Sequence, residues 1–145
     1  MYKKKAIIAS GYFNPIHKGH LELLQKCSQI GDEVWVIVNS DLQRELKGSK
    51  PFMDQYERLE IVSAIKYVSR ANISVDQDQT QCETLKVIAS YFGKAFTLYF
   101  ANGGDQTNES IPEYQTCIDN DIRMVDGLGE KVQSSSWLLS SSDSD

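Results

Sequence analysis

The sequence predicts a single α/β domain in which a parallel sheet carries helices on both faces. Short apolar runs alternate along the chain with longer stretches of helical spacing, and glycine-containing loops separate them. The 145 residues suffice for one domain with its own core. Strands that alternate with helices favour a parallel sheet. In such sheets ligands bind beyond the carboxyl ends of the strands, so we expect the chemistry in the loops there.

Five apolar runs are expected to form the strands. The run 6–10 ends directly before a glycine, and 33–39 is rich in β-branched residues, so both are predicted to be buried strands. The run 96–101 leads straight into Asn-Gly-Gly-Asp. Two shorter strands are expected over 73–75 and 122–125. The loops after 6–10 and after 96–101 are the most unusual in the chain.

Helical spacing of apolar residues predicts the segments between the strands. Asp54 is expected to cap the second helix at its N-terminus, and Gly31 to end the first. The polar segment 40–53 contains glycine and proline, so we expect a loop there. The domain is expected over 1–139, and the Ser and Asp residues of 140–145 are expected to form a disordered tail. The expected helices are 18–30, 54–68, 79–92 and 112–120, with a helical turn over 134–139.

Composition excludes several classes of function. The chain has 15 basic and 20 acidic side chains, a net charge of −5, which argues against coating a nucleic acid but not against a local phosphate site. Cys27, Cys82 and Cys117 are widely spaced, so neither a disulfide framework nor a zinc site is indicated. Reduced thiols fit a reducing compartment. The apolar run near the N-terminus is too short for a signal peptide or a membrane span, so we expect a cytoplasmic protein.

The loop 11–20 contains both histidines of the sequence. His17 and His20 lie three apart at the start of an expected helix, so they share a face. Gly19 removes a side chain where a ligand would approach, and a helix N-terminus favours anions. Together these features predict a phosphate cradle with two imidazole donors, as attack on a phosphoryl group requires. A coincidental pair on a helix face is the alternative; a metal site lacks an evident third ligand nearby.

The pattern Gly-x-Phe-Asn-Pro-x-His-x-Gly-His over 11–20 closely resembles the HxGH signature of the nucleotidylyltransferase superfamily. That group includes cytidylyltransferases, nicotinate-nucleotide and phosphopantetheine adenylyltransferases, and the adenylyltransferase domain of heptose-phosphate enzymes. Further motifs resemble most the heptose-phosphate adenylyltransferase domain and glycerol-3-phosphate cytidylyltransferase. The resemblance spans nearly the whole chain and implies a Rossmann-like fold. The motifs are Val38-Asn39-Ser40-Asp41, Leu46-Lys47-Gly48, Lys50-Pro51, Glu57-Arg58, Gly103-Gly104-Asp105 and Ser134-Ser135-Ser136.

Three departures from the heptose and glycerol-phosphate pattern leave the substrate open. The pair Asn14-Pro15 looks more like the nicotinate-nucleotide branch. Asn102 stands where the heptose branch commonly has lysine. Trp137 and the two leucines after it follow the Ser-rich turn, where a lysine or arginine is usual.

The resemblance implies the reaction and the residues that carry it. A substrate phosphate attacks the α-phosphorus of a Mg²⁺-bound triphosphate and pyrophosphate leaves, so catalysis is positioning plus charge stabilisation. Mg²⁺ is expected on the triphosphate, with no side-chain ligand assigned. The expected catalytic residues are His17, His20, Lys47, Lys50 and Arg58. The expected nucleotide-binding residues are Gly11, Tyr12, Phe13, Asn14, Gly19, Gly104, Asp105, Ser134, Ser135 and Ser136, and the expected substrate-binding residues are Asn39 and Asp41.

Alternatives remain for residues and for substrates. The alternative for Lys47 and Lys50 is that they are solvated loop lysines, and for Arg58 that it forms a surface ion pair. The alternative for Asp105 is that it forms a turn and contacts neither a ribose nor Mg²⁺. The resemblance favours a sugar-phosphate or polyol-phosphate acceptor and leans to ATP over CTP. The alternatives are a nicotinate-nucleotide-like adenylyltransferase and a non-catalytic nucleotide-binding protein of the same fold. A homodimer is also considered. The segment 106–120 has no assigned mechanism beyond shaping the acceptor pocket.

Overall fold

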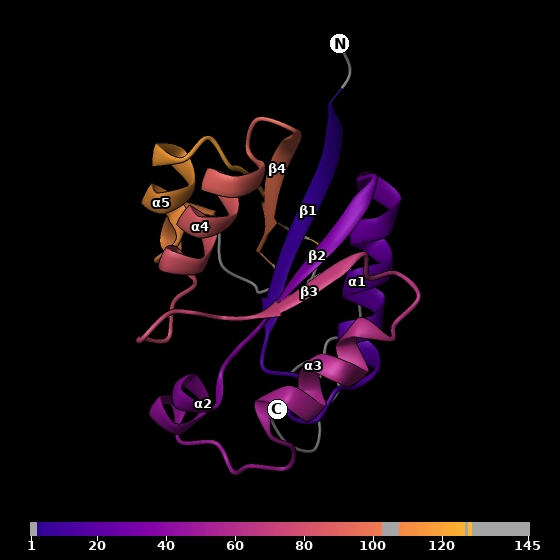
Figure 1. Ribbon diagram of the computed structural model, residues 1–145, viewed down its shortest axis with the longest axis vertical. Coiled ribbons are helices and arrows are strands. Elements are labelled where there is room, and N and C mark those ends of the chain that lie inside the picture. Colours follow the sequence, from indigo (N-terminus) through magenta and orange to yellow (C-terminus); the bar gives the residue numbers. More distant parts are fainter. Residues whose placement is uncertain (1–2, 103–107, 127, 129–145) are drawn as a thin grey trace.

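The computed structural model describes residues 3–102, 108–126 and 128 of the chain. Within this part, five parallel strands form one sheet in the order β3-β2-β1-β4-β5 (Figure 1). The predicted α/β class with an all-parallel sheet is confirmed. The strands are β1 (Lys4–Gly11), β2 (Glu33–Val38), β3 (Arg70–Ile73), β4 (Phe96–Ala101) and β5 (Arg123–Val125).

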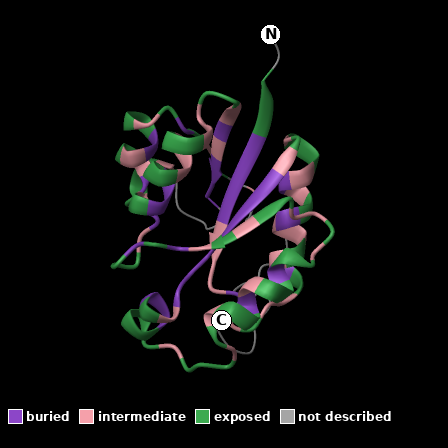
Figure 2. Ribbon diagram, in the orientation of Figure 1, coloured by how far each residue is buried: buried purple, intermediate pink, exposed green. Residues whose placement is uncertain are grey.

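Helices cover both faces of the sheet, as predicted (Figure 1). One face is covered by α1 (Lys18–Ile30) and α3 (Gln55–Ser63), and the other face by α4 (Cys82–Phe92) and α5 (Tyr114–Asp119). Alternation along β1 feeds two cores: Ile7 packs toward Leu24 of α1, and Ile8 toward Leu85 of α4. Burial on both sides explains why the central strands are continuous apolar runs (Figure 2).

The segment 40–53, expected to be a loop, contains a helix, α2 (Asp41–Lys47). Ser40 and Gln43 form a capping box, in which each side chain accepts from the backbone N–H of the other. Gly48 ends the helix in the left-handed conformation, at φ 84°. Two good caps therefore stabilise a polar seven-residue helix that has no apolar periodicity to reveal it.

Several predicted boundaries shift. Asp54 caps α3 as expected, but the helix ends at Ser63 rather than at 68. Gly31 follows α1 as expected, but its backbone is extended; a Cβ there would collide with the Ile7 side chain, so close packing rather than conformation requires glycine. The strand β3 precedes its predicted place, and α4 and α5 are shorter at their starts, α5 following a short 3₁₀ turn, η1 (Asn108–Ser110). The predicted turn 134–139 and tail 140–145 lie outside the described residues.

The order of the strands decides where a ligand can bind. The chain runs outward from β1 through β2 to β3, and then returns to place β4 on the other side of β1. The connections after β1 and β4 therefore diverge to opposite faces, which opens a crevice at their carboxyl ends. Among the described residues, no helix is long and apolar enough to cross a membrane.

Candidate active site

The loop between β1 and α1 brings the two histidines together, as predicted. His17 is the N-cap of α1: its Nδ1 accepts from the N–H of Gly19 at 3.1 Å, and Nδ1 of His20 accepts from the N–H of His17 at 3.0 Å. The rings stack with their centroids 3.8 Å apart and an interplanar angle of 22°. His20 also packs on the Phe13 ring, 4.8 Å between centroids. The same two hydrogen bonds thus cap the N-terminus of α1 and hold the two imidazole rings in a stacked arrangement.

The hydrogen bonds fix the tautomer of both rings. Because Nδ1 accepts in His17 and in His20, the proton of each neutral imidazole lies on Nε2. Two Nε2–H donors therefore stand at the N-terminus of a 13-residue helix, whose dipole favours anions. Fixed donors of this kind stabilise charge that develops on phosphoryl oxygens.

The backbone before the histidines is tightly folded. Phe13 has a φ of 52°, in the left-handed region that residues other than glycine rarely adopt. Its ring is buried and lies over Gly11, where a Cβ would come within 3.0 Å of Phe13 Cζ. Strained backbone of this kind is typical of ligand-binding loops. Gly11 is therefore needed so that the chain can turn closely at the end of β1.

Asn14, expected to bind nucleotide, contacts the segment after α2 through its side-chain amide. Its Nδ2 donates to the carbonyl of Lys50 at 2.7 Å, and its Oδ1 accepts from the N–H groups of Phe52 and Met53 at 3.1 and 3.3 Å. Both ends of the amide are thus engaged by the segment after α2. Asn14 therefore ties that segment, with Lys50, to the histidine loop.

Arg58, expected to face phosphate, is engaged by the protein itself in this structure. The side chain is fully buried, and its guanidinium donates to the carbonyls of Tyr12 (2.8 Å), Asn39 (2.7 Å) and Met53 (3.1 Å). Nη2 pairs with Asp41 Oδ1 at 2.8 Å. A buried guanidinium must be paired in this way to offset its lost hydration. Arg58 therefore joins the ends of β1 and β2 to α2 and α3.

Asp41 and the lysines differ in what they contact. The Asp41 carboxylate, expected to bind substrate, accepts hydrogen bonds from Arg58 and from the N–H of Gln55, the latter at 3.3 Å. Lys47 is exposed, and its ammonium lies 4.5 Å from the centroid of the Tyr12 ring, a cation–π contact. Lys50 is also exposed. The structure thus places one of the two predicted lysines directly against the loop that follows β1.

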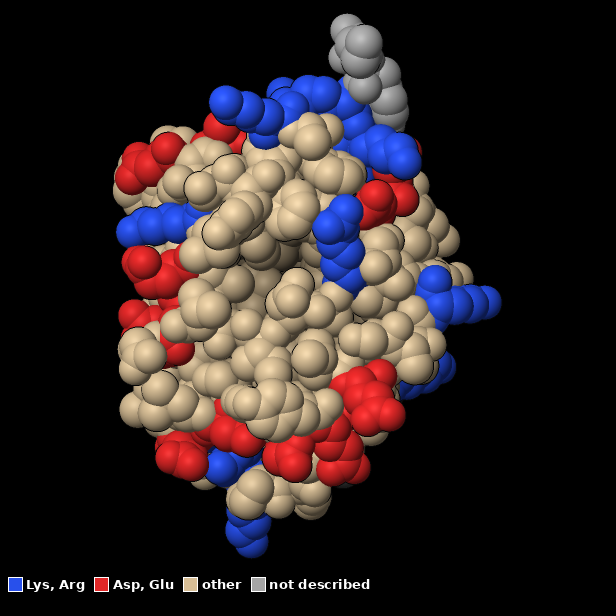
Figure 3. All heavy atoms as spheres, in the orientation of Figure 1, with Lys and Arg blue, Asp and Glu red and all other residues tan. Residues whose placement is uncertain are grey.

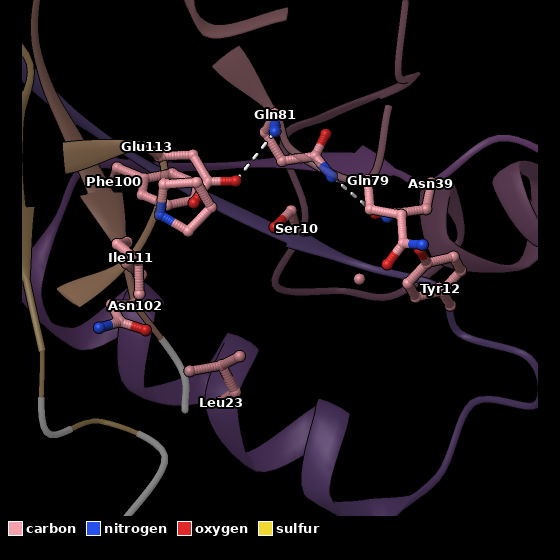
Figure 4. Close-up of a pocket in the computed structure, with 13 residues that line it drawn as sticks. Ser10, Tyr12, Leu23, Asn39, Gln79, Gln81, Phe100, Asn102, Ile111 and Glu113 are labelled. Carbon is pink, nitrogen blue, oxygen red and sulfur yellow. Dashed lines mark hydrogen bonds between the residues drawn. The ribbon is translucent and has the colours of Figure 1, made fainter. Parts of the chain in front are cut away.

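A pocket of about 440 Å³ opens at the carboxyl ends of β1, β2 and β4 (Figure 4). It lies at the point where the strand order reverses, which is where the α/β class predicts a ligand. The predicted residues Gly11, Tyr12 and Asn39 line it. The lining also includes Ser10, Leu23, Gln79, Gln81, Phe100, Ala101, Asn102, Ile111, Pro112 and Glu113.

One wall of the pocket was not predicted from the sequence. Gln81, at the start of α4, donates through Nε2 to Oδ1 of Asn39 at 3.1 Å, and its backbone N–H donates to Glu113 Oε2 at 2.9 Å. Gln81 sits in a polar loop without any motif, so no signal pointed to it. Glu113 lies in the segment 106–120, which was expected at most to shape the acceptor pocket, and in the structure it lines this pocket.

Charge is distributed unevenly around the molecule. Acidic side chains gather along the lower edge of Figure 3, over α2 and α3, where Glu45, Asp54 and Glu57 border a second, shallow hollow. Basic side chains gather at the opposite end, where β1 begins. The net charge of −5 therefore says little about any single site.

The buried thiols have no evident part in the chemistry. Burial raises the pKa of Cys27 to about 12, and burial, with the nearby Glu113 carboxylate, does the same for Cys117. Among the described residues, no cluster of three or more His, Cys, Asp or Glu side chains is placed to hold a metal ion. Gly19, between the histidines, is buried in α1. The remaining predicted residues, Gly104, Asp105, Ser134, Ser135 and Ser136, lie outside the described part of the chain.

Comparison with known proteins reveals the relatives of this chain. A family model described as cytidylyltransferase-like matches residues 8–133. The FAD synthase of Methanocorpusculum labreanum is 33% identical over 137 residues, which cover 93% of each chain. The bifunctional protein HldE of Geobacter metallireducens is 32% identical over 127 residues, covering 72% of this chain but 26% of that one.

A solved structure shares the fold. The lipopolysaccharide core biosynthesis protein from Thermoplasma volcanium superimposes with a TM-score of 0.63 over 85% of this chain and 95% of that one. The two sequences are 23% identical, so the likeness concerns the fold alone. The arrangement of strands and helices in this chain is therefore a fold already seen by experiment.

Proposed function

We propose that this chain, which belongs to the cytidylyltransferase-like family, transfers AMP from ATP to the phosphate of a phosphorylated polyol or sugar. The family and the relatives show the class of reaction: the chain is a nucleotidyltransferase that releases pyrophosphate. The choice of nucleotide and acceptor is the proposal.

One observation carries it: the loop that lines the switch-point pocket continues directly into the paired histidines. Gly11 and Tyr12 line the pocket, and the same loop continues into His17 and His20 at the N-terminus of α1. A ligand in the pocket therefore has a natural place for a phosphate where the Nε2–H donors and the helix dipole meet it.

The reaction then needs no protein nucleophile. An oxygen of the acceptor phosphate forms a bond to the α-phosphorus while the bond from that phosphorus to the bridging oxygen breaks, and pyrophosphate leaves. His17 and His20 donate to the α-phosphoryl oxygens as charge develops on them. Lys47, held over the Tyr12 ring, and Lys50, tied by Asn14, supply mobile positive charge for the leaving pyrophosphate. Arg58 and Asp41 position this loop without contacting the nucleotide.

Mg²⁺ fits this site as a companion of the triphosphate. No group of three or more His, Cys, Asp or Glu side chains in the described part of the chain is placed to hold a metal ion. Mg²⁺ is commonly held by substrate phosphates together with one or two carboxylates. When bound, it neutralises charge on the phosphate oxygens and makes pyrophosphate a better leaving group. We therefore propose that the reaction requires Mg²⁺ and that the phosphates of the substrate provide most of the ligands of the ion.

The relatives favour ATP and a polyol phosphate. FAD contains an adenosine unit, and FMN, which FAD exceeds by one AMP, is itself the phosphate of a polyol chain. The match to an FAD synthase extends over 93% of both chains, so FMN is a specific candidate acceptor beside heptose and glycerol phosphates. All three share a hydroxylated carbon chain or ring that ends in phosphate.

The test is pyrophosphate release from ATP and from CTP with Mg²⁺. The acceptors are FMN, heptose 1-phosphate, glycerol 3-phosphate and nicotinate mononucleotide, each run also with His17→Asn. We expect release with ATP and one polyol or sugar phosphate, and loss of most of it in the variant. Release with nicotinate mononucleotide alone would move the protein to the nicotinate branch. A protein that binds neither nucleotide would refute the proposal.

A further inference from the structure

We propose that Gln81 and Glu113 bind hydroxyl groups of the acceptor, and so select a polyhydroxylated phosphate. This inference rests on the proposed function and names the residues that choose its second substrate. The two side chains form the wall of the pocket at the starts of α4 and α5. Figure 4 shows Glu113 and Tyr12 on opposite sides of the pocket, with Gln81 between Glu113 and Asn39.

The first argument is an unsatisfied acceptor. Gln81 is 3% exposed, and its Nε2 is bound to Asn39 Oδ1, which fixes the orientation of the amide. Its Oε1 is buried and has no hydrogen-bond partner among the described residues. Buried polar atoms in native proteins are nearly always paired, so the unpaired oxygen of a side chain that lines a pocket leaves a place for a donor on the ligand. The ligand group that meets Gln81 therefore carries O–H or N–H.

The second argument is the charge of the lining. Of the described residues that line the pocket, Glu113 is the one with a charged side chain, and it is 8% exposed. Its carboxylate, held by the N–H of Gln81, accepts hydrogen bonds and repels phosphate. The phosphate of the acceptor must then lie at the other side, near Tyr12, Lys47 and the histidines. The part that reaches Glu113 is uncharged and rich in donors.

The third argument is the shape of the rest of the wall. Phe100, Ile111 and Pro112 give apolar surface beside the two acceptor groups. A polyol or sugar has this character, because hydroxyl donors alternate with C–H groups along it. A small number of polar groups in an otherwise apolar pocket is the usual means of fixing a ligand's orientation.

The test compares two variants with two matched controls. Gln81→Met keeps the size of the side chain but removes its acceptor, and Glu113→Gln removes the charge while keeping an acceptor for the N–H of Gln81. Gln77→Met and Glu109→Gln change the same residue types at exposed positions in the same loops, outside the pocket lining. The measured quantities are KM for the acceptor, KM for ATP, and kcat, with folding checked by circular dichroism.

We expect each pocket variant to raise the acceptor KM about tenfold, the effect of losing one hydrogen bond to a buried or charged group. The KM for ATP should stay within about twofold, and both controls should match the wild type. A rise in the KM for ATP with the acceptor KM unchanged would assign the wall to the nucleotide and overturn the proposal. No change in either constant would overturn it as well.

Two further arms separate this inference from the proposed function. Turnover with FMN but with neither ribitol 5-phosphate nor the sugar phosphates would show selection by the flavin ring, not by hydroxyls, and would overturn the inference alone. Calorimetric titration of the same acceptors without nucleotide tests binding where no pyrophosphate is released. Binding that weakens about tenfold in Gln81→Met would support the inference even if the proposed reaction failed. A wild-type protein that binds none of these acceptors would overturn it.

Discussion

Replacing the buried Arg58 with methionine tests whether this residue holds the fold or contacts phosphate. The variant removes four hydrogen bonds, three to backbone carbonyls and one to the Asp41 carboxylate. Carbonyls left buried without a donor cost about 1 kcal/mol or more each. The Asp41 side chain is 35% exposed, so its pairing contributes only about 0.5 kcal/mol after screening. The sum is a loss of about 3 to 4 kcal/mol, a large part of the ~5–15 kcal/mol that stabilises a domain.

The assay is urea unfolding followed by circular dichroism, together with a thermal melt. For a chain of this size, a loss of about 3 to 4 kcal/mol lowers Tm by roughly 12 °C. Arg58→Lys, which keeps the charge but reaches fewer carbonyls, should lose about half as much. Both variants should raise the KM for ATP only slightly, through misplacement of the loop after β1. If Arg58→Met unfolds at the wild-type urea concentration while its KM for ATP rises strongly, the guanidinium contacts phosphate and the structural role is wrong.

Three further predictions follow from the geometry. Asparagine is a good N-cap, so His17→Asn should keep the thermal stability of the wild type but lower kcat about a hundredfold, measured by pyrophosphate release; an unchanged kcat would refute the role of its Nε2–H. Gly31→Ala should cost about 1–3 kcal/mol in urea unfolding, because its Cβ meets a buried side chain; equal stability would contradict that close contact. At about pH 8, iodoacetamide should label the half-buried Cys82 and leave Cys27 and Cys117 unlabelled, because burial raises the pKa of each of these two thiols to about 12. Labelling would be measured by mass spectrometry, and labelling of either buried thiol would contradict this reasoning.

Periodicity and cap residues predicted most of the fold. The apolar runs predicted β1, β2 and β4 closely, because central strands buried on both faces are continuously apolar. The edge strand β3 is half exposed and overlaps its predicted place only at Ile73. The segment 40–53 failed because its helix buries no apolar face, and its stability comes from caps at Ser40 and Gly48. The boundaries of β3 and α4 differ from those predicted because the polar residues of the loop between them, 74–81, show no hydrophobic periodicity.

The histidine loop could be predicted because its chemistry is local in sequence. His17 and His20 are three residues apart, so the capping box at the start of α1 brings their rings together. The roles of Arg58, Asp41 and Asn14 could not be predicted in this way. Each contacts backbone or side-chain groups 14 to 46 positions away, and a guanidinium that binds carbonyls has the same sequence signature as one that binds phosphate.

The sequence by itself determined the α/β class, the histidine pair and the family resemblance, since these depend on composition and on spacing within one element. Only the tertiary structure decided which side chains face the pocket. Gln81 and Glu113 lie 32 positions apart and meet because α4 and α5 pack on the same face of the sheet. The return of the chain to β4 beside β1 creates the crevice between them and the histidine loop. A site assembled from the ends of separate strands and helices exists only once the sheet has formed.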